Sequence, residues 1–575
     1  MSYFDWTVLI ITLAGIIFYG LYKSRTTKNL DGYFLSNREM PWYIVLFSIM
    51  GTQASAITFL SAPGQAYTDG MRFVQYYFGL PLAMIVLCIT FVPIFHKTRL
   101  YTAYEFLEKR FDVKTRTLTS FLFLLQRGLS TGISIYAPSI ILSSLLGWNI
   151  YWTNIFMGGL LIIYTAMGGA RSVAYTQQLQ IIIIFISLFI AGYLVVKYMP
   201  EGISFLDALK VSGAEGRTNV ITTGFEKGNG FDWRDRYNLL SGIIGGFFLA
   251  LSYFGTDQSQ VGRYLTAKSI KESRLGLLMN GLVKVPMQFF ILLLGVLIFA
   301  FYQFNNAPLF FNEAQVSKID KTIYKDSLQH IRQQYDLLEA KKTQLARTMV
   351  AENEDDSEIK AALMMVNRQR DSLRKAVTTI ISKPEVGGDS NDTNYIFLRF
   401  VLDYLPKGLI GLLIAVIFIS SWGSIAAALN SLSSSTIVDI HKKFINKDMD
   451  EAKDYSVSRK YTIAWGIFCI IVAQFAYNIG NSLIEAVNIL GSLFYGVILG
   501  VFLVAFYGKK IKSNAVFWGA IAGEILVVTL FILNENKVID LGFLWLNAIG
   551  ALAVVFFGWI LQVSFFSKDN SRFSI

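Results

Sequence analysis

The residues best suited to chemistry are small, polar side chains set within long apolar stretches of the chain. Residues 51–58 read Gly-Thr-Gln-Ala-Ser-Ala-Ile-Thr, and residues 61–64 read Ser-Ala-Pro-Gly. A helix interrupted at membrane depth leaves backbone carbonyls without partners, and a desolvated cation satisfies such carbonyls. The alternative is a kinked helix whose Ser and Thr hydroxyls bond back to its own backbone. This stretch alone favours neither interpretation.

A second polar stretch has the same character. Residues 420–424 read Ser-Ser-Trp-Gly-Ser, and residues 429–436 read Leu-Asn-Ser-Leu-Ser-Ser-Ser-Thr. Sodium is a hard cation, and hydroxyl and carbonyl oxygens bind it without the cost of burying a full charge. Small residues also let membrane helices pack closely, so a purely structural role stays open.

A few ionisable side chains lie within the apolar stretches, where charge is costly and faces a cavity or a partner. They are Arg127, Asp257, Lys284, Glu485 and Glu524. Asp257 and Glu485 lie near the predicted ends of their stretches, which favours structural roles for both. Lys284 and Arg127 are therefore the better candidates for contact with a solute.

Neither an enzyme nor a nucleic-acid-binding protein is indicated. His96, His330 and His441 lack metal-ligand spacing, and no Gly-rich stretch leads into the Lys-Ser/Thr pair of a phosphate-binding loop. The net charge of +11 comes from short connectors between apolar stretches, where basic residues report membrane topology. Cys88 and Cys469 lie within apolar stretches, which favours buried side chains over a disulfide. We expect no catalytic residues.

The composition predicts an all-α membrane protein. Of its 575 residues, 54% are hydrophobic and only 16% are charged, and the mean hydropathy is +0.47. Soluble domains are far less apolar, and a spanning helix needs roughly 20 apolar residues. We expect about 13 transmembrane helices, near 6–23, 42–66, 73–95, 118–146, 150–168, 175–198, 239–262, 275–304, 405–436, 461–479, 483–507, 514–533 and 541–566.

The connectors predict the orientation. Asp5 precedes the first apolar stretch and Lys23 follows it, which indicates a retained helix that begins outside the cell. Every second connector is then cytoplasmic, and these carry most of the basic residues, among them Lys109, Arg110, Arg263, Lys268, Lys442, Lys443, Lys509 and Lys510. We expect a multi-pass protein of the cell (inner) membrane with its amino terminus outside and its carboxyl terminus in the cytoplasm.

Two polar stretches, residues 199–238 and 305–395, divide the chain. The second, centred on residues 315–382, is rich in charged residues with leucines at helical spacing, and predicts a helical hairpin outside the membrane with its turn at 352–356. A solvated spacer is favoured over a module that binds an unknown partner. The expected parts are a first helix with a cytoplasmic linker (1–41), a first core part (42–304), an extracytoplasmic helical insert (305–395), a second core part (396–507) and two C-terminal helices with a cytoplasmic tail (508–575).

Five motifs are specific when taken together. They are GYFL at 32–35, YTAYEFLEKRF at 101–111, GTDQSQVGRYLTAK at 255–268, LNS at 429–431 and GSLFYG at 491–496. In these motifs the chain resembles the sodium/solute symporter family, over nearly its whole length outside the insert. The resemblance implies a five-plus-five inverted-repeat core like that of the leucine-type amino-acid transporters, and sodium-coupled transport of a small solute.

Three further stretches concern the branch of the family. Residues 55–58, 63–67 and 134–138 look most like the iodide, monocarboxylate and multivitamin branch. This resemblance implies that the solute is an organic or inorganic anion.

The resemblance also implies a sodium site. Carried over by position, the carbonyls of Gly51 and Ala54 face the carbonyl of Ser420 and the hydroxyl of Ser424. Relatives have adjacent hydroxyl residues where this chain has Gly423 before Ser424, so one hydroxyl ligand is lost. A second sodium site needs an acidic residue and two hydroxyls, and this chain has Gln177 and Ala426-Ala427 there, so we expect none.

The sugar-binding members of the family imply a solute site. The corresponding positions here are Thr58, Tyr77, Leu80, Ala250, Tyr253 and Lys284. Tyr253 matches as a stacking gate and Lys284 as a cation, but several hydrogen-bonding side chains for sugar hydroxyls are missing. Each unmatched buried polar group costs roughly 1–3 kcal/mol, so a sodium/sugar symporter is the alternative and not the first choice.

The resulting hypothesis is alternating access about a site between the broken helix, residues 243–258 and residues 420–431. Lys284, or in second place Arg127, compensates an anionic solute, and Tyr76 and Tyr253 line the outer and inner gates. A sensor that binds solute without net transport is the alternative from another class. An ion channel is not favoured, because the sequence shows no ring-forming selectivity loop.

Overall fold

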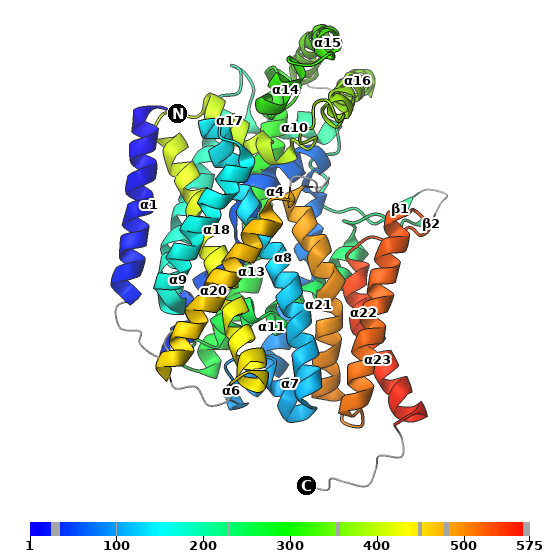
Figure 1. The fold of residues 1–575 in the computed structure, drawn as a ribbon. Helices are drawn as coiled ribbons and strands as arrows, with labels where there is room; N and C mark the ends of the chain where they lie inside the picture. Colours follow the sequence, from blue (N-terminus) through cyan, green and yellow to red (C-terminus); the bar gives the residue numbers. More distant parts are fainter. Residues whose placement is uncertain are drawn as a thin grey trace.

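The computed structural model describes residues 1–24, 35–98, 100–226, 230–351, 357–446, 451–476 and 482–566, and these residues are almost entirely helical. The only strands among them are β1 (Phe225–Glu226) and β2 (Gly230–Phe231), an antiparallel pair. Long helices run side by side from one face of the molecule to the other (Figure 1). Residues 32–34 of the GYFL motif and the predicted turn at 352–356 lie outside the described residues.

The membrane helices follow the predicted apolar stretches. Ten helical stretches of the described chain are long and apolar enough to span a membrane, and one bent pair makes an eleventh. Two shorter apolar helices, Ile150–Thr165 and Ser241–Thr256, occupy the positions of the remaining two predicted spans. The all-helical membrane fold predicted from the sequence is therefore confirmed.

The helices that cover the predicted spans begin and end as follows. They are α1 (Tyr3–Ser24), α3 (Trp42–Gln53), α4 (Ala56–Asp69), η2 (Met71–Tyr77), α5 (Leu80–Val86), η3 (Leu87–Phe91), α6 (Val92–Thr98), α8 (Val113–Leu146), α9 (Ile150–Lys197), η4 (Ser241–Gly245), α11 (Gly246–Thr256), α12 (Gln258–Tyr264), α13 (Ile270–Phe304), α18 (Leu409–Ser435), η6 (Thr436–His441), α20 (Glu451–Ala473), α21 (Leu483–Tyr507), α22 (Ser513–Glu535) and α23 (Trp545–Ser564).

Shorter helices lie in the connectors. They are η1 (Ser36–Arg38), α7 (Glu105–Arg110), α10 (Phe205–Ala214), α14 (Glu313–Ile319), η5 (Thr393–Tyr395), α17 (Ile396–Tyr404) and α19 (Lys442–Phe444). The helical stretch α9 covers both spans predicted at 150–168 and 175–198, which the structure keeps as two apolar segments, Ile150–Thr165 and Val173–Lys197, with the Tyr164 and Thr176 hydroxyls 3.3 Å apart.

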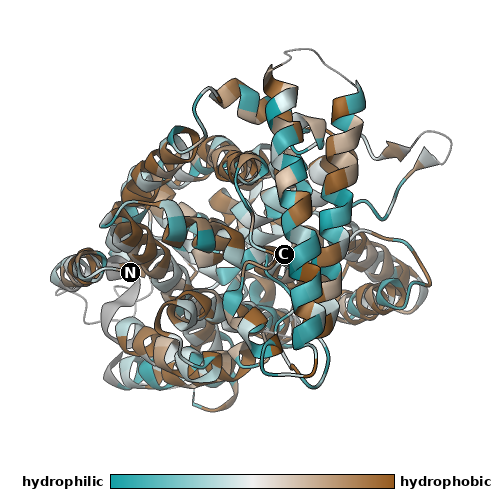
Figure 2. Cartoon of the chain, turned by 90° about the horizontal axis from the view of Figure 1, so that it is seen from above, coloured by the Kyte–Doolittle hydropathy of each residue, from teal (hydrophilic) through white to brown (hydrophobic). Residues whose placement is uncertain are grey.

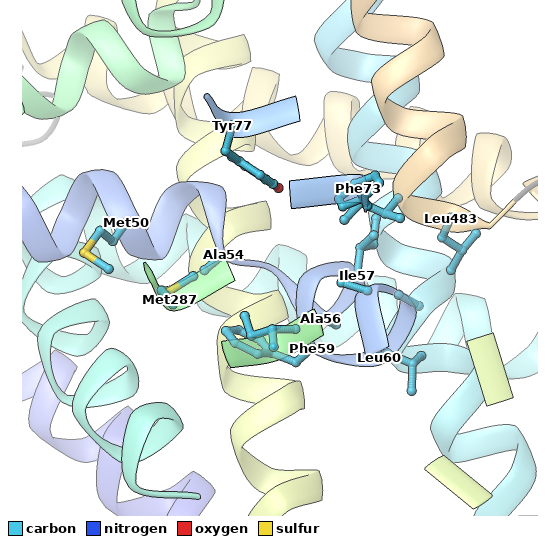
Figure 3. Packing of buried hydrophobic residues seen from close by; sticks show 14 of the residues in the cluster. Met50, Ala54, Ala56, Ile57, Phe59, Leu60, Phe73, Tyr77, Met287 and Leu483 are labelled. Atoms are coloured by element: carbon cyan, nitrogen blue, oxygen red, sulfur yellow. The ribbon is translucent and has the colours of Figure 1, made fainter. Parts of the chain in front are cut away.

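The bent pair α3–α4 interrupts the first helix of the transmembrane core. Ala54 and Ser55 have extended backbone with ψ of 90° and 177°, and the two helices meet at a bend of 61°. The break falls inside the Gly, Ser and Thr-rich run at 51–58, as the interrupted-helix interpretation requires. Figure 3 shows Ala54 at the end of one helix and Ala56 and Ile57 at the start of the next.

A second interruption lies at Asp257, between α11 and α12, where ψ is 117°. The freed carbonyl of Thr256 accepts a hydrogen bond of 2.8 Å from the Tyr104 hydroxyl, and the Asp257 carboxylate accepts from the Ser259 N–H at 2.7 Å. Two family motifs thus meet at this break. Each set of five core helices, starting at α3 and at η4–α11, begins with an interrupted helix, which is typical of inverted-repeat transporters.

The insert folds back onto the core. Its hairpin of α15 (Lys325–Ala351) and α16 (Ser357–Ile381) lies across the face that also carries the amino terminus (Figure 1), and it is largely hydrophilic from above (Figure 2). Lys342, which is fully buried, donates to the carbonyls of Tyr302 and Asn305 at the end of α13. The face carrying this hairpin is called the insert face below.

Glu339 lies at the centre of the contact between the insert and the core, where it pairs with two basic side chains. Its carboxylate is 2% exposed, lies 2.7 Å from the Lys342 ammonium and 2.5 Å from the Arg370 guanidinium, and accepts the Ala307 N–H at 2.9 Å. A solvated spacer has no such buried ion network, so the spacer interpretation is wrong for this part of the hairpin. In the sequence these residues look like ordinary surface charges.

Glu339→Ala should loosen the hairpin, because it leaves two buried cations unpaired at a cost of about 3–5 kcal/mol. We expect a lower melting temperature and faster tryptic cleavage at the Arg and Lys residues of α16. Asp336→Ala, at an exposed position of the same helix, is the matched control. Equal cleavage rates for the two variants would show that this ion network does not hold the insert.

Candidate functional site

A cavity lies beside the break between α3 and α4. Its walls come from helices far apart in the sequence, namely α3, α4, η2, α5, α8, α11, α13, α18 and α21. Thr52, Gln53 and Ser55 from the break line it together with Ser424 of α18. This space is called the central cavity below.

The break presents backbone oxygens toward α18. The Ala54 N–H bonds to the Met50 carbonyl at 2.7 Å and the Ser55 N–H to the Gln53 carbonyl at 3.1 Å, so no donor from the described residues reaches the Gly51 carbonyl. The Ala54 carbonyl accepts from the Ser420 hydroxyl at 2.6 Å. Because a carbonyl oxygen has two lone pairs, it keeps acceptor capacity for a cation.

The residues expected on α18 differ in what they present. Ser420 lies inside the continuous helix and turns its hydroxyl, rather than its carbonyl, to the break. The Ser424 hydroxyl donates to the Ser421 carbonyl at 3.0 Å, and Ser424 lines the central cavity. A Cβ atom at Gly423 would lie 2.6 Å from the amide oxygen of Gln180, so the glycine leaves room for that amide.

Gln177 fills the space between the break and α18. Its amide oxygen accepts from the Ser48 hydroxyl at 2.9 Å, and its amide nitrogen donates to the Thr52 hydroxyl and to the Gly423 carbonyl, each at 3.2 Å. A Cβ atom at Gly51 would meet the Gln177 side chain at 2.8 Å. Where the resemblance implies an acidic ligand in some relatives, this chain has a neutral side chain that ties three helices together.

All residues predicted to bind solute or to form a gate lie on the central cavity. They are Thr58, Tyr76, Tyr77, Leu80, Arg127, Tyr253 and Lys284. The Tyr76 hydroxyl donates to the Asn488 side chain at 3.0 Å, and the Tyr253 hydroxyl accepts from the Gln260 amide at 2.7 Å. Each tyrosine thus connects a different pair of helical segments at the cavity wall.

Arg127 is paired with a carboxylate at the second helix interruption. Its guanidinium lies 3.6 Å from Asp257 and 5.9 Å from the centre of the Tyr253 ring. The same carboxylate accepts from the Tyr495 hydroxyl at 2.7 Å. The positive charge of Arg127 is therefore compensated by the protein itself.

Lys284 has no such compensation. Its side chain is 1% exposed, its ammonium lies 6.0 Å from the centre of the Tyr77 ring, and no carboxylate of the described chain lies within 4.0 Å of it. Asn280 and Gln288 lie one turn before and one turn after Lys284 on α13. Their buried side-chain amides have no hydrogen-bond partner among the described residues. A buried cation without a counter-charge is costly unless a ligand supplies one.

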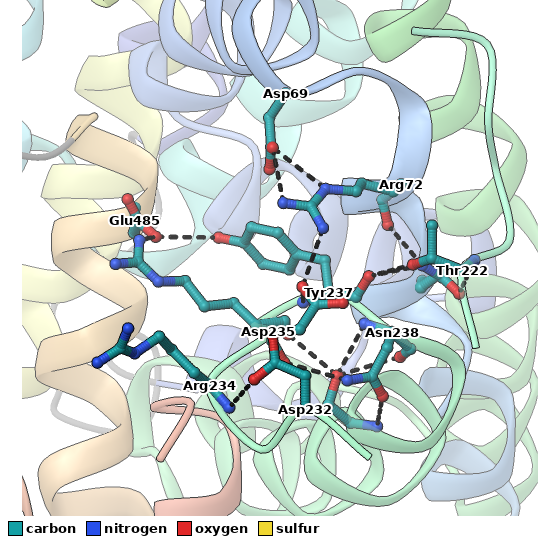
Figure 4. Close-up of polar contacts among 12 residues, drawn as sticks. Asp69, Arg72, Thr222, Asp232, Arg234, Asp235, Tyr237, Asn238 and Glu485 are labelled. Carbon is teal, nitrogen blue, oxygen red and sulfur yellow. Dashed lines mark hydrogen bonds and ion pairs between the residues drawn. The ribbon is translucent and has the colours of Figure 1, made fainter. Parts of the chain in front are cut away.

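A polar network lies at the insert-face ends of helices that line the cavity (Figure 4). Arg72 lies 2.8 Å from Asp69 and 2.9 Å from Asp235. Arg236 pairs with Glu485 of α21, and the Tyr237 hydroxyl donates to the same carboxylate at 3.5 Å. These contacts join the end of α4, the loop before η4 and the start of α21.

The central cavity also has polar residues that the sequence analysis missed. The Gln126 amide on α8 donates to the Ser130 hydroxyl at 2.9 Å, and Ser134 follows one turn later. Asn488 and Tyr495 line the cavity from α21. The spacing of four residues on α8 and of seven on α21 places each set on one helix face, and this periodicity was the available signal.

Asp257→Asn should destabilise the protein, because the Arg127 guanidinium loses its counter-charge inside the membrane, at a cost of about 3–5 kcal/mol. We expect a lower melting temperature in detergent. The double variant Arg127→Gln/Asp257→Asn should regain part of the loss, because it removes both charges. Strictly additive losses would contradict the pairing.

The comparisons with known proteins agree with this architecture. The family model described as "Sodium:solute symporter family" matches residues 33–319 and 372–523, which is more than half of the chain and leaves out most of the insert. A solved structure of a substrate-bound, outward-open Na⁺-coupled sialic acid symporter matches with a TM-score of 0.74 at 23% identity, over 98% of each chain. The leucine-transporter-like fold predicted from the sequence is confirmed by this likeness.

Two curated relatives match nearly the full length. The sodium/sialic acid symporter NanT of Aliivibrio fischeri is 24% identical over 99% of this chain and 94% of its own. The sodium/sialic acid symporter SiaT of Proteus mirabilis is 25% identical over 100% of this chain and 98% of its own. By the match to the family model, this multi-pass membrane protein belongs to the sodium:solute symporter family and is a transporter, not an enzyme.

Proposed function

We propose that this protein carries an organic anion across the membrane together with sodium, by alternating access. Sodium is a co-transported substrate in this proposal and not a resident cofactor. The single observation that carries it is the position of the uncompensated Lys284 in the same cavity as the helix break. The cavity thus offers oxygens to a cation and a positive charge to an anion.

The proposed sodium site lies at the break. The Gly51 and Ala54 carbonyls and the Ser424 hydroxyl are its ligands, as the family resemblance implies. The Ser420 hydroxyl donates to the Ala54 carbonyl. When sodium binds, this hydroxyl either rotates away from the carbonyl or keeps the carbonyl oriented toward the ion. Gly423 itself supplies no side-chain ligand.

The proposed solute site lies around Lys284. Arg127 already has a counter-charge in Asp257, so Lys284 is the better partner for a carboxylate and Arg127 is now the weaker candidate. Thr58, Tyr77, Leu80 and Tyr253 shape the remainder of the site. The two relatives named for sialic acid carry an organic anion, which supports the same charge for this solute. The resemblance of three sequence stretches to the iodide, monocarboxylate and multivitamin branch also implies an anion.

The orientation follows from the basic connectors. The insert and the amino terminus share one face (Figure 1), and the connectors rich in Lys and Arg belong to the opposite face. By the positive-inside rule the insert face is outside. Tyr76 then belongs to the outer gate and Tyr253 to the inner gate.

The experiment is uptake into proteoliposomes driven by an inward sodium gradient, with sodium replaced by choline as the control. The probes are radiolabelled N-acetylneuraminate, pyruvate, iodide and glucose. We expect sodium to stimulate uptake of at least one of the anions, and preloaded unlabelled anion to drive counterflow. Sodium-independent uptake would contradict coupling, and binding without counterflow would indicate a sensor.

Ser424→Ala should weaken sodium binding, because it removes a hydroxyl oxygen beside the break. We expect the sodium concentration for half-maximal uptake to rise about tenfold, which corresponds to loss of one ligand worth about 1.4 kcal/mol. Ser433→Ala is the matched control, since it lies further along α18 and its hydroxyl donates to the Ser458 carbonyl of α20. Indistinguishable sodium dependence in the two variants would remove Ser424 from the site.

Lys284→Gln should lose affinity for the anion, because the amide keeps the shape of the side chain but not its charge. We expect KM for the anion to rise at least tenfold, since a charged hydrogen bond is worth about 1.5–3 kcal/mol, while the sodium requirement stays. Lys271→Gln, at an exposed position of the same helix, is the control. An unchanged KM would place the anion elsewhere.

A further inference from the structure

A second enclosed space lies between the insert and the transmembrane core. It is lined by residues of α4, α13, η5 and the loop after α10, which contributes Glu215 and Arg217, and by Arg370, Asp371, Arg374 and Lys375 of α16. This insert-base cavity exists only because the hairpin folds back onto the core.

Basic residues outnumber acidic ones on its walls, but Arg370 and Arg374 are each paired with a buried carboxylate, which leaves Arg217 and Lys375 as the lining cations without a carboxylate partner in the described ranges. Four lining residues are basic and two are acidic. Arg370 and Arg374 are held in place by Glu339 and Asp392, and the Arg217 guanidinium lies 5.1 Å from the centre of the Phe299 ring. Lys375 has no ion pair with any residue in the described ranges. Three of the four cations come from the insert.

The insert-base cavity adjoins the polar space at the insert-face mouth of the molecule. Thr68 and Thr393 line both spaces, and the second also includes Gln65, Ser482 and Glu485. Ile484, next to Glu485 on α21, lines the central cavity. The insert-base cavity thus shares two lining residues with the polar space, and Glu485 of the polar space is the chain neighbour of Ile484 on the central cavity.

We propose that the insert-base cavity captures the anionic solute before it enters the transport path. The ligand class is a small carboxylate or comparable anion, the same solute that the central cavity binds. This inference rests on the proposed function, because it takes the transported solute to be an anion. An excess of one sign of charge on the walls of a cavity raises the local concentration of ions of the opposite sign and so speeds association.

Lys375 is the residue that tests the proposal. Its side chain is exposed, lines the cavity and takes no part in anchoring the hairpin. A charge reversal there alters the field in the cavity without breaking a buried contact. Lys341 provides a matched control, because it is an exposed lysine on α15 that does not line the cavity.

The experiment compares initial uptake of radiolabelled N-acetylneuraminate, or of iodide if iodide is the anion transported, by the full chain in neutral-lipid liposomes at fixed sodium. We expect Lys375→Glu to lower kcat/KM about threefold to tenfold with kcat within twofold, and Lys375→Gln to lie between it and the unmodified protein. Choline chloride at 0.5 M should shrink the difference, because salt screens the field. Lys341→Glu should leave kcat/KM unchanged.

Two results overturn the inference. One is equal behaviour of Lys375→Glu and Lys341→Glu, and the other is an effect of Lys375→Glu that salt does not reduce. Absence of any sodium-stimulated anion uptake by the unmodified protein contradicts the proposed function instead. The two failures are therefore distinguishable in the same series of measurements.

Discussion

Backbone oxygens that no helix satisfies, placed within an apolar environment, are the constraint on which this structure depends. Two residues of extended backbone, Ala54 and Ser55, end one helix and begin another at 61°. Hydrocarbon offers no donors, so the freed groups must find partners in neighbouring helices or in a bound ion. The Ser420 hydroxyl fills part of this need at the Ala54 carbonyl, and the Gln177 side chain links α9 to the Ser48 and Thr52 hydroxyls of α3 and to the Gly423 carbonyl of α18.

The same constraint shapes the second interruption. At Asp257 the side chain caps the helix that follows, and Tyr104 satisfies the carbonyl that precedes it. The carboxylate then serves a second purpose by compensating Arg127. Lys284, by contrast, lines the same cavity with no carboxylate of the described residues within 4.0 Å. Because Arg127 has a counter-charge and Lys284 has none among the described residues, Arg127 is the structural cation and Lys284 is the one available to a ligand. In the sequence the two residues look alike.

Hydropathy located the apolar helices of the described residues, because burial in lipid leaves long apolar runs that need no partner to be recognised. It did not decide whether the helix is broken at 51–58, because glycine and small polar residues there also fit a kinked helix. It did not predict the interruption at Asp257, since a single residue capped by its own side chain leaves no compositional trace. The docking of the insert was missed for a similar reason: Glu339, Lys342 and Arg370 are surface residues by type and are buried only through one another.

Family resemblance and structure contribute different parts of the site. Resemblance to the family singled out positions on the central cavity. The face formed by Gln126, Ser130 and Ser134 and the contact of Gln180 with Gly423 became visible only in the structure. The most direct measurement of sodium at the break is amide hydrogen exchange of the purified protein in sodium chloride and in choline chloride. Sodium bound there should slow exchange in peptides covering residues 50–58 and 420–425 and leave the C-terminal helices α22 and α23 unchanged. Exchange in these two segments that is identical with and without sodium would contradict the site.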